Sequence, residues 1–254
     1  MSQKRERKKR ERSRRLNVAK PNAAGSDRAA VEKDLESFSE QAGQAAAPYL
    51  QRDDLAANVE ALTNEVRNLA LRLMEQSPKW GSYDCRPGCA FCCHTSITVA
   101  PPEAFAIARY LKDNYPEDVL TQVRRRIEEN AESATNMTRE AYIAGNIPCA
   151  MLTEDGNCLV HPVRPIVCAG FLSTSRAKCE AEFKHLVKRD PVPVDKYTML
   201  VGLGVSFGLK DACRKAGLDG NFYELHHALR RVMDVPDAAE KWAGRQNVFD
   251  GCPL

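Results

Sequence analysis

Apolar residues follow a helical spacing directly after residue 53. They recur there in alternating steps of four and three residues, which is the stripe of an amphipathic helix. The positions are Leu55, Val59, Leu62, Val66, Leu69 and Leu73. Asp53 and Asp54 suit the first turn of this helix, and Pro78 ends it. The stripe also permits a short coiled coil, but fewer than three clean heptads favour packing against a core.

The same periodicity predicts further helices along most of the remaining chain. Their expected ranges are about 101–114, 116–145, 174–186, 194–209 and 220–232, with a last short helix from Asp237. Residues 96–99 are short, β-branched and alternating, which is typical of a strand. We therefore predict a mostly α fold, a helical domain with irregular cysteine-rich metal-binding loops and at most a short hairpin.

Residues 1–50 differ from the rest of the chain in charge and composition. Ten Lys or Arg against two Glu give residues 1–20 a net charge of +8, which leaves −5 for the remainder. From Pro21 to about Pro48 the chain is rich in small and polar residues, as in a poorly ordered linker. We therefore expect a disordered basic tail and linker over residues 1–50 and a single domain over residues 51–254.

The basic tail has two interpretations. Residues 4–15 either form a solvated charge run, as most charge blocks do, or contact nucleic acid or another anionic partner. A contact with phosphates would be sensitive to salt and independent of base sequence.

Composition narrows the class of protein. Of the 254 residues 43% are hydrophobic and 28% charged, and no apolar stretch approaches the roughly 20 residues that cross a bilayer. No apolar region follows the basic N-terminus, so we predict no secretory signal and a cytoplasmic location. In such a reducing compartment dense cysteine patterns indicate metal or redox sites more often than disulfides.

Four thiols and an imidazole lie within ten residues of one another. The run holds Cys85, Cys89, Cys92, Cys93 and His94. Thiolates are the soft ligands that zinc and iron prefer, and two-residue gaps let neighbouring cysteines converge on one ion. The first gap is three residues long, and Pro87 and Gly88 supply the bend that it requires.

Four more cysteines follow at nearly even intervals: Cys149, Cys158, Cys168 and Cys179. The turn residues Asp155-Gly156-Asn157 predict a hairpin that brings Cys149 and Cys158 together. Pro162 and Pro165 are expected to hold the chain extended as far as Cys168. Cys179 falls in a predicted helix, from which it either reaches the site or packs in an apolar seam. We expect Cys213 and Cys252, which lie outside this pattern, to be structural or free thiols.

These spaced elements resemble the YkgJ-type CxxCxxCC cysteine-cluster family, which is described as zinc- or iron-chelating. The likeness covers roughly residues 80–180 and includes Gly156-Asn157-Cys158 and Arg164-Pro165. It implies an eight-cysteine metal site at Cys85, Cys89, Cys92, Cys93, Cys149, Cys158, Cys168 and Cys179. A related branch, the flagellin lysine methylases, suggests iron–sulfur and methyl-transfer chemistry, for which this chain shows no further motif.

Eight thiolates could fill two zinc sites of four ligands each, or four could hold one zinc ion or iron–sulfur cluster beside four supporting thiols. Adjacent side chains point differently, so we predict that one of Cys92 and Cys93 faces the primary site, while the other faces a second ion or serves as a thiol held near the site. His94 and His161 are candidate supplementary ligands, although hydrogen-bonded loop histidines are commoner. Arg164 could pair with a thiolate or with a surface carboxylate. We expect His226 and His227 to be polar surface or core residues.

Several functions remain open at this point. The pattern favours a cytosolic protein that chelates zinc or iron, with a dithiol redox pair at Cys89 and Cys92 or disulfides as weaker interpretations. An iron–sulfur enzyme or electron carrier and a nucleic-acid-associated protein are the alternatives. The sequence contains no nucleotide-phosphate loop, nucleophile elbow or metalloprotease motif, so catalysis is left undecided.

Overall fold

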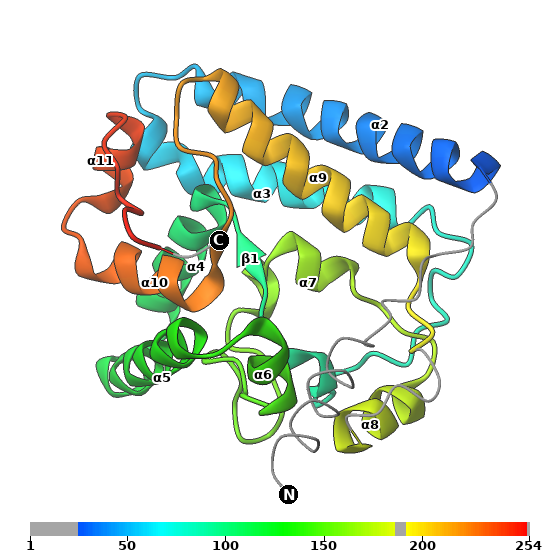
Figure 1. Ribbon diagram of the computed structural model, residues 1–254. Coiled ribbons are helices and arrows are strands. Elements are labelled where there is room, and N and C mark those ends of the chain that lie inside the picture. Colours follow the sequence, from blue (N-terminus) through cyan, green and yellow to red (C-terminus); the bar gives the residue numbers. More distant parts are fainter. Residues whose placement is uncertain (1–24, 186–191, 253–254) are drawn as a thin grey trace, which may run out of the picture. The chain divides into compact units, whose positions relative to one another are not determined.

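The computed structural model describes residues 25–185 and 192–252, so the basic residues 4–15 lie outside the described part of the chain. Its helices are α2 (Gly25–Leu50), α3 (Leu55–Met74), α4 (Pro101–Asn114), α5 (Glu117–Asn136), α6 (Arg139–Ala144), α7 (Ile166–Gly170), α8 (Arg176–His185), α9 (Lys196–Lys215), α10 (Leu225–Asp234) and α11 (Ala238–Ala243), with the 3₁₀ turns η1 (Phe91–His94) and η2 (His161–Val163). Strands β1 (Thr98–Val99) and β2 (Tyr223–Glu224) pair antiparallel. The prediction of a mostly α fold is confirmed (Figure 1).

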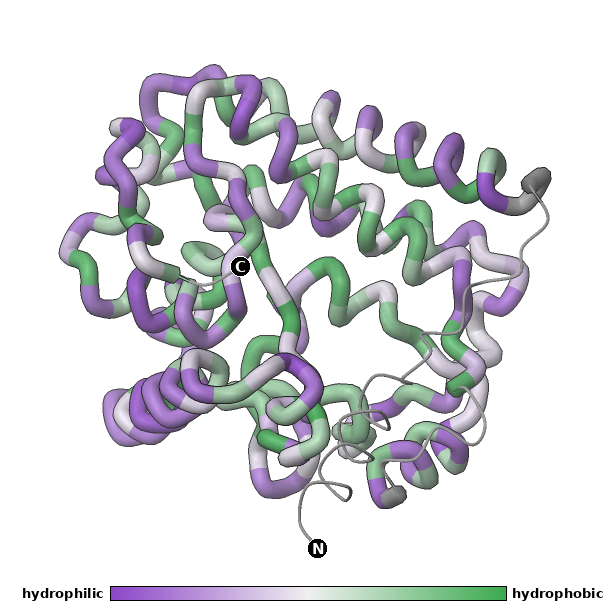
Figure 2. The backbone as a smooth tube through the Cα atoms, viewed as in Figure 1, coloured by the Kyte–Doolittle hydropathy of each residue, from purple (hydrophilic) through white to green (hydrophobic). Residues whose placement is uncertain are grey.

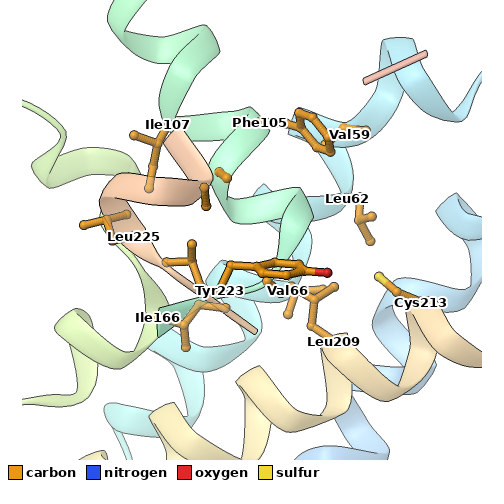
Figure 3. Close-up of a cluster of buried hydrophobic side chains, with 14 of the residues drawn as sticks. Val59, Leu62, Val66, Phe105, Ile107, Ile166, Leu209, Cys213, Tyr223 and Leu225 are labelled. Carbon is orange, nitrogen blue, oxygen red and sulfur yellow. The ribbon is translucent and has the colours of Figure 1, made fainter. Parts of the chain in front are cut away.

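Helix α3 carries the apolar stripe that the sequence predicts, and this stripe lies in the core. The helix packs against α4, α9 and α11. Leu62 and Val66 are completely buried, and Figure 3 shows them near Phe105 of α4 and Leu209 of α9. Burial of a large aliphatic side chain contributes about 1.5–3 kcal/mol, so this face stabilises α3 far more than helix propensity does. Packing against the core, rather than a coiled coil, accounts for the stripe.

Helix α9 approaches two neighbours so closely that glycine is required at the contacts. A Cβ atom at Gly204 would lie 2.7 Å from the Cβ of Phe38, and one at Gly208 would collide with the backbone oxygen of Ser39. Both contacts are with α2. On its other side, Gly202 faces α7, where a Cβ atom would lie 3.3 Å from the oxygen of Ile166. The glycines that interrupt the apolar pattern of this helix therefore serve close packing.

Residues 25–50, which we expected to form a linker outside the core, form α2 instead. From Phe38 onward this helix buries one residue in four against the core: Phe38, Ala42, Ala46 and Leu50. Two of these four side chains are alanines. A segment rich in small residues therefore suggests a linker, although its buried positions are regularly spaced. Alanine also has the highest helix propensity and permits the close contact with α9.

Three other boundaries differ from the prediction. The helix expected over 116–145 is broken into α5 and α6 at Thr138, whose hydroxyl accepts a hydrogen bond from Ala141 N–H. The helix expected from residue 220 begins only at Leu225, because Tyr223 and Glu224 pair with β1. Residues 161–163 form a 3₁₀ turn and Ile166 begins α7, so the stretch before Cys168 is not extended. Pro162 and Pro165 lie at the starts of these turns, where their missing N–H group costs nothing.

Helix α5 is hydrophilic on its outer face and contacts the core with its apolar side chains. Figure 2 shows that α5 is mostly hydrophilic, and it contacts the core through Val123, Ile127 and Ala131. No helix within residues 25–185 or 192–252 has the length and apolar character needed to cross a membrane.

Candidate metal centre

The first cysteine run forms a tight turn followed by η1. Gly88 adopts a positive φ of 80°, which a residue with a side chain rarely adopts, and Cys89 N–H donates to the Arg86 oxygen across this turn. Cys93 N–H donates to the Ala90 oxygen in the next turn. The bend predicted from Pro87 and Gly88 is thus present.

The second cysteine segment closes directly onto the first. Cys149 N–H donates to the Cys93 oxygen at 2.8 Å, and Gly88 N–H donates to Asn157 Oδ1 at 3.0 Å. The predicted turn at Asp155-Gly156-Asn157 has its glycine at a φ of 74°, and Leu152 pairs with Cys158 as a single antiparallel bridge. A turn with this pairing brings Cys149 and Cys158 to one side of the loop.

Helix α8 carries Cys179 and is fixed beside Cys85. The Ser173 N–H lies 3.4 Å from Cys85 Sγ, and Asp84 Oδ2 accepts from Arg176 N–H at 3.1 Å. Aromatic contacts hold α8 against η1, since the Phe183 ring lies 5.7 Å from the Phe91 ring. The start of the first cysteine run is therefore held beside the start of α8, and Phe91 of η1 contacts Phe183 near the other end of this helix.

Cys168 lies on α7, which a buried carboxylate anchors to α4. Glu103 accepts hydrogen bonds from Ala100 N–H at 3.0 Å and from Ile166 N–H at 2.9 Å, and its side chain is almost fully buried. Burial raises the pKa of Glu103, and the two N–H donors oppose this rise. The carboxyl group thereby positions the first turn of α7 and, two residues later, Cys168.

This carboxyl group predicts a dependence of stability on pH. Because its pKa is higher in the folded protein than in the unfolded chain, the folded state binds more protons above about pH 4.5. Its contribution is fully present at lower pH and is lost as the pH rises through the folded pKa. The free energy of unfolding, measured with urea at several pH values above about 4.5, should fall as the pH rises in the native chain. This decrease should be absent in Glu103→Gln. An identical slope in the variant would contradict the assignment.

The eight thiols can be described as two groups of four, with Cys92 acting electrostatically on members of both. We name as the outer thiol group Cys85, Cys89, Cys92 and Cys179. Burial raises the pKa of Cys85 and of Cys179, and in both cases nearby thiols, including Cys89 and Cys92, raise it further. These four side chains therefore lie within electrostatic range of one another.

The inner thiol group consists of Cys93, Cys149, Cys158 and Cys168. Burial raises the pKa of Cys158 to about 11 and that of Cys168 well above its usual value, with Cys149 raising both. Cys149 and Cys158 also pack against the hydrophobic core. Burial thus desolvates Cys158 and Cys168, and these two thiols stay protonated in the absence of a cation.

The adjacent pair Cys92 and Cys93 joins the two groups. A hydrogen bond from the Cys93 thiol lowers the pKa of Cys92 to about 7, and the same bond raises the pKa of Cys93. Cys92 is therefore the thiol most readily ionised at neutral pH. The prediction that these adjacent cysteines face different centres stays a prediction.

The thiols are near one another without forming a ready coordination shell. Within residues 25–185 and 192–252, no three His, Cys, Asp or Glu side chains are arranged to hold a metal ion as they stand. The donor chemistry nevertheless fits zinc or iron, because eight thiols lie on neighbouring loops and short helices and thiolates are the ligands that both metals prefer. Side-chain rotation would be needed to bring either set into a tetrahedron.

The histidines and Arg164 have other partners. His94 Nδ1 lies 3.0 Å from the Ala90 oxygen, and His161 Nε2 accepts from Arg164 at 2.9 Å. Arg164 also lowers the pKa of several thiols, with Cys92 and Cys158 among them. Both histidines are thus hydrogen-bonded loop residues.

Sequence analysis missed a buried contact behind the inner thiol group. His226 Nε2 accepts a hydrogen bond from Ala150 N–H at 3.3 Å, and its Nδ1 lies 2.9 Å from Glu224 Oε1. Asn130 donates to the Pro148 oxygen at 2.8 Å. These groups fix the backbone on both sides of Cys149, and nothing in the local sequence around His226 indicates it.

Cys213 and Cys252 lie outside both thiol groups. Cys213 is fully buried in the core on α9, and Figure 3 shows it near Leu209. Cys252 is partly buried, with its Sγ atom 3.8 Å from the His227 oxygen. Neither has a thiol of the two groups among its neighbouring charges.

Comparison with protein families supports the resemblance seen in the sequence. Residues 84–188 match the CxxCxxCC family, described as "Putative zinc- or iron-chelating domain". This segment contains all eight thiols of the two groups and α8. The description is consistent with metal binding and leaves the choice between zinc and iron open. Neither the curated proteins nor the solved structures gave a significant match.

Proposed function

We propose that this protein chelates two metal centres of zinc or iron, one in each thiol group, and acts in the cytosol. The observation that carries this proposal is the division of the eight thiols into two sets of four that meet at Cys92 and Cys93. Four thiolates complete a closed zinc site, and four also hold an iron–sulfur cluster. Two sets of that size, adjoining at Cys92 and Cys93, support two neighbouring centres better than one centre with four spare thiols.

The two thiol groups differ in burial, and this difference predicts how tightly each holds its metal. The inner thiol group presents four thiols from η1, the turn at residues 149–158 and α7, and core residues exclude water from its rear. The outer thiol group has two exposed members, Cys85 and Cys92. Arg164, which lowers the pKa of nearby thiols, supplies positive charge next to the thiolates. We therefore expect tighter retention in the inner group and easier exchange in the outer group.

Metal content of protein purified without oxygen tests the proposal. Elemental mass spectrometry and a visible spectrum should give about two zinc ions per chain and no colour, or iron with acid-labile sulfide and broad visible absorbance. The second result would favour the iron–sulfur alternative and direct attention to redox or electron-transfer chemistry. A single metal ion per chain, or none after reconstitution with either metal, would contradict the two-centre proposal.

A further inference from the structure

A cavity of about 270 Å³ lies between the strand pair and the junction of α5 with α6, and it has no part in the thiol groups. Its lining residues are Ser96, Thr98, Ala134, Met137, Arg139, Tyr142 and Glu224. A water molecule takes about 30 Å³ in the liquid, so the space is large enough for a small organic molecule.

The Tyr142 hydroxyl is the least satisfied polar group of this cavity. The side chain is 2% exposed, and the hydroxyl has no hydrogen-bond partner among the described residues. Burial raises the pKa of Tyr142, and the nearby Glu224 carboxylate raises it further. The phenol therefore stays neutral and keeps its proton to donate. A buried donor without an acceptor is costly and rare in folded proteins.

Glu224 does not supply the missing acceptor. Its oxygens already accept from the N–H groups of His226 and His227, at 2.9 and 3.0 Å, and lie 2.9 Å from His226 Nδ1. These donors belong to the N-terminus of α10, whose helix dipole offsets the negative charge. The carboxylate is thus satisfied by the protein itself.

The other polar groups of the lining are donors as well. Ser96 and Thr98 contribute hydroxyl groups, and Arg139 contributes a guanidinium that is the only cation of the lining. Guanidinium groups match the geometry of carboxylates, to which they can donate two parallel hydrogen bonds. Met137 and Ala134 provide an apolar edge beside these donors.

We propose that this cavity binds a small organic carboxylate, with its oxygens facing Tyr142 and Arg139 and its carbon skeleton against Met137. The lining of the cavity is distinct from the proposed metal centres, although Cys149 of the inner thiol group lies near enough to raise the pKa of Tyr142. It uses none of the eight thiols, and a ligand of this class satisfies the Tyr142 hydroxyl, which is one of five buried side-chain atoms without a hydrogen-bond partner among the described residues.

Calorimetry and thermal unfolding with pyruvate and succinate test the proposal on the full chain as purified. At least one of the two should bind and raise the unfolding temperature. Tyr142→Phe and Arg139→Gln should each weaken binding about tenfold or more, because each removes a hydrogen bond to a charged group. Arg125→Gln, on the exposed face of α5, is the matched control and should bind as the native chain does.

Tyr142→Phe also separates a ligand site from a purely structural tyrosine. Removing an unsatisfied buried hydroxyl should raise the unfolding temperature of the ligand-free protein while reducing the rise that the carboxylate produces. Absence of binding by both carboxylates, or equal affinity in native protein and Tyr142→Phe, would overturn the proposal. Metal content measured on the same samples reports separately on the thiol groups.

Discussion

Cys168→Ser is expected to remove the metal of the inner thiol group and to destabilise the fold at the same time. The thiol lies on α7, which packs against α9 and α3, and burial keeps its pKa well above the usual value. A serine hydroxyl is a poor ligand for zinc or iron in such a site. Because binding to a closed thiolate site contributes directly to folding, the variant should lose about half of its metal and unfold at lower temperature. Elemental analysis and thermal denaturation measure the two effects.

Two further substitutions make this prediction specific. Cys85→Ser, in the exposed part of the outer thiol group, should also lose about half of the metal but leave the core and the unfolding temperature closer to the native values. Cys252→Ser, outside both groups, should retain the full metal content. Native metal content in Cys168→Ser would exclude this thiol from the site.

The helices that sequence analysis predicts best are those with large apolar side chains. Helix α4 begins at Pro101 as predicted, and α3 follows its stripe from Leu55 to Met74, although it ends four residues before Pro78 and has Asp54 as its N-cap rather than in its first turn. Helix α2 was not predicted, because two of its buried positions are Ala42 and Ala46, and alanine is not recognised as a core residue from composition. Its stability depends on glycines of α9 far along the chain, a tertiary contact that a local pattern does not contain.

The thiols were predictable and most of their surroundings were not. Cysteine spacing predicts eight candidate metal ligands, and the adjacent pair Cys92 and Cys93 suggests either a second ion or a thiol held near the first. The group to which Cys168 or Cys179 belongs depends on where α7 and α8 pack. Glu103 positions α7 by accepting a hydrogen bond from Ile166 N–H, and Ser173 N–H, just before α8, contacts Cys85 Sγ. His226 lies 76 residues beyond Ala150, so the hydrogen bond between them, next to Cys149, could not be predicted from local sequence and is visible only in the folded structure.

Gly170→Ala is expected to have the second largest effect, because it would push α7 away from α9. A Cβ atom at this glycine would lie 2.6 Å from the backbone oxygen of Thr198 and 3.2 Å from Met74 Cε. The flexible methionine could move, but the backbone of α9 could not. Overpacking of this kind typically costs about 1–3 kcal/mol in the free energy of unfolding, which urea denaturation would measure.

The same change should weaken the inner thiol group, because Gly170 lies two residues after Cys168 on one short helix. The Thr198 hydroxyl donates to the Gly170 oxygen at 2.8 Å, so a shift of α7 also strains this hydrogen bond. Competition with a chelator should therefore remove the inner metal from Gly170→Ala more easily than from the native protein. Gly43→Ala is the matched control: a Cβ atom there meets nothing within 4 Å, and alanine inside α2 should stabilise the protein by about 0.5–1 kcal/mol. Equal metal retention in the two variants, despite opposite changes in stability, would show that the position of α7 does not control the inner site.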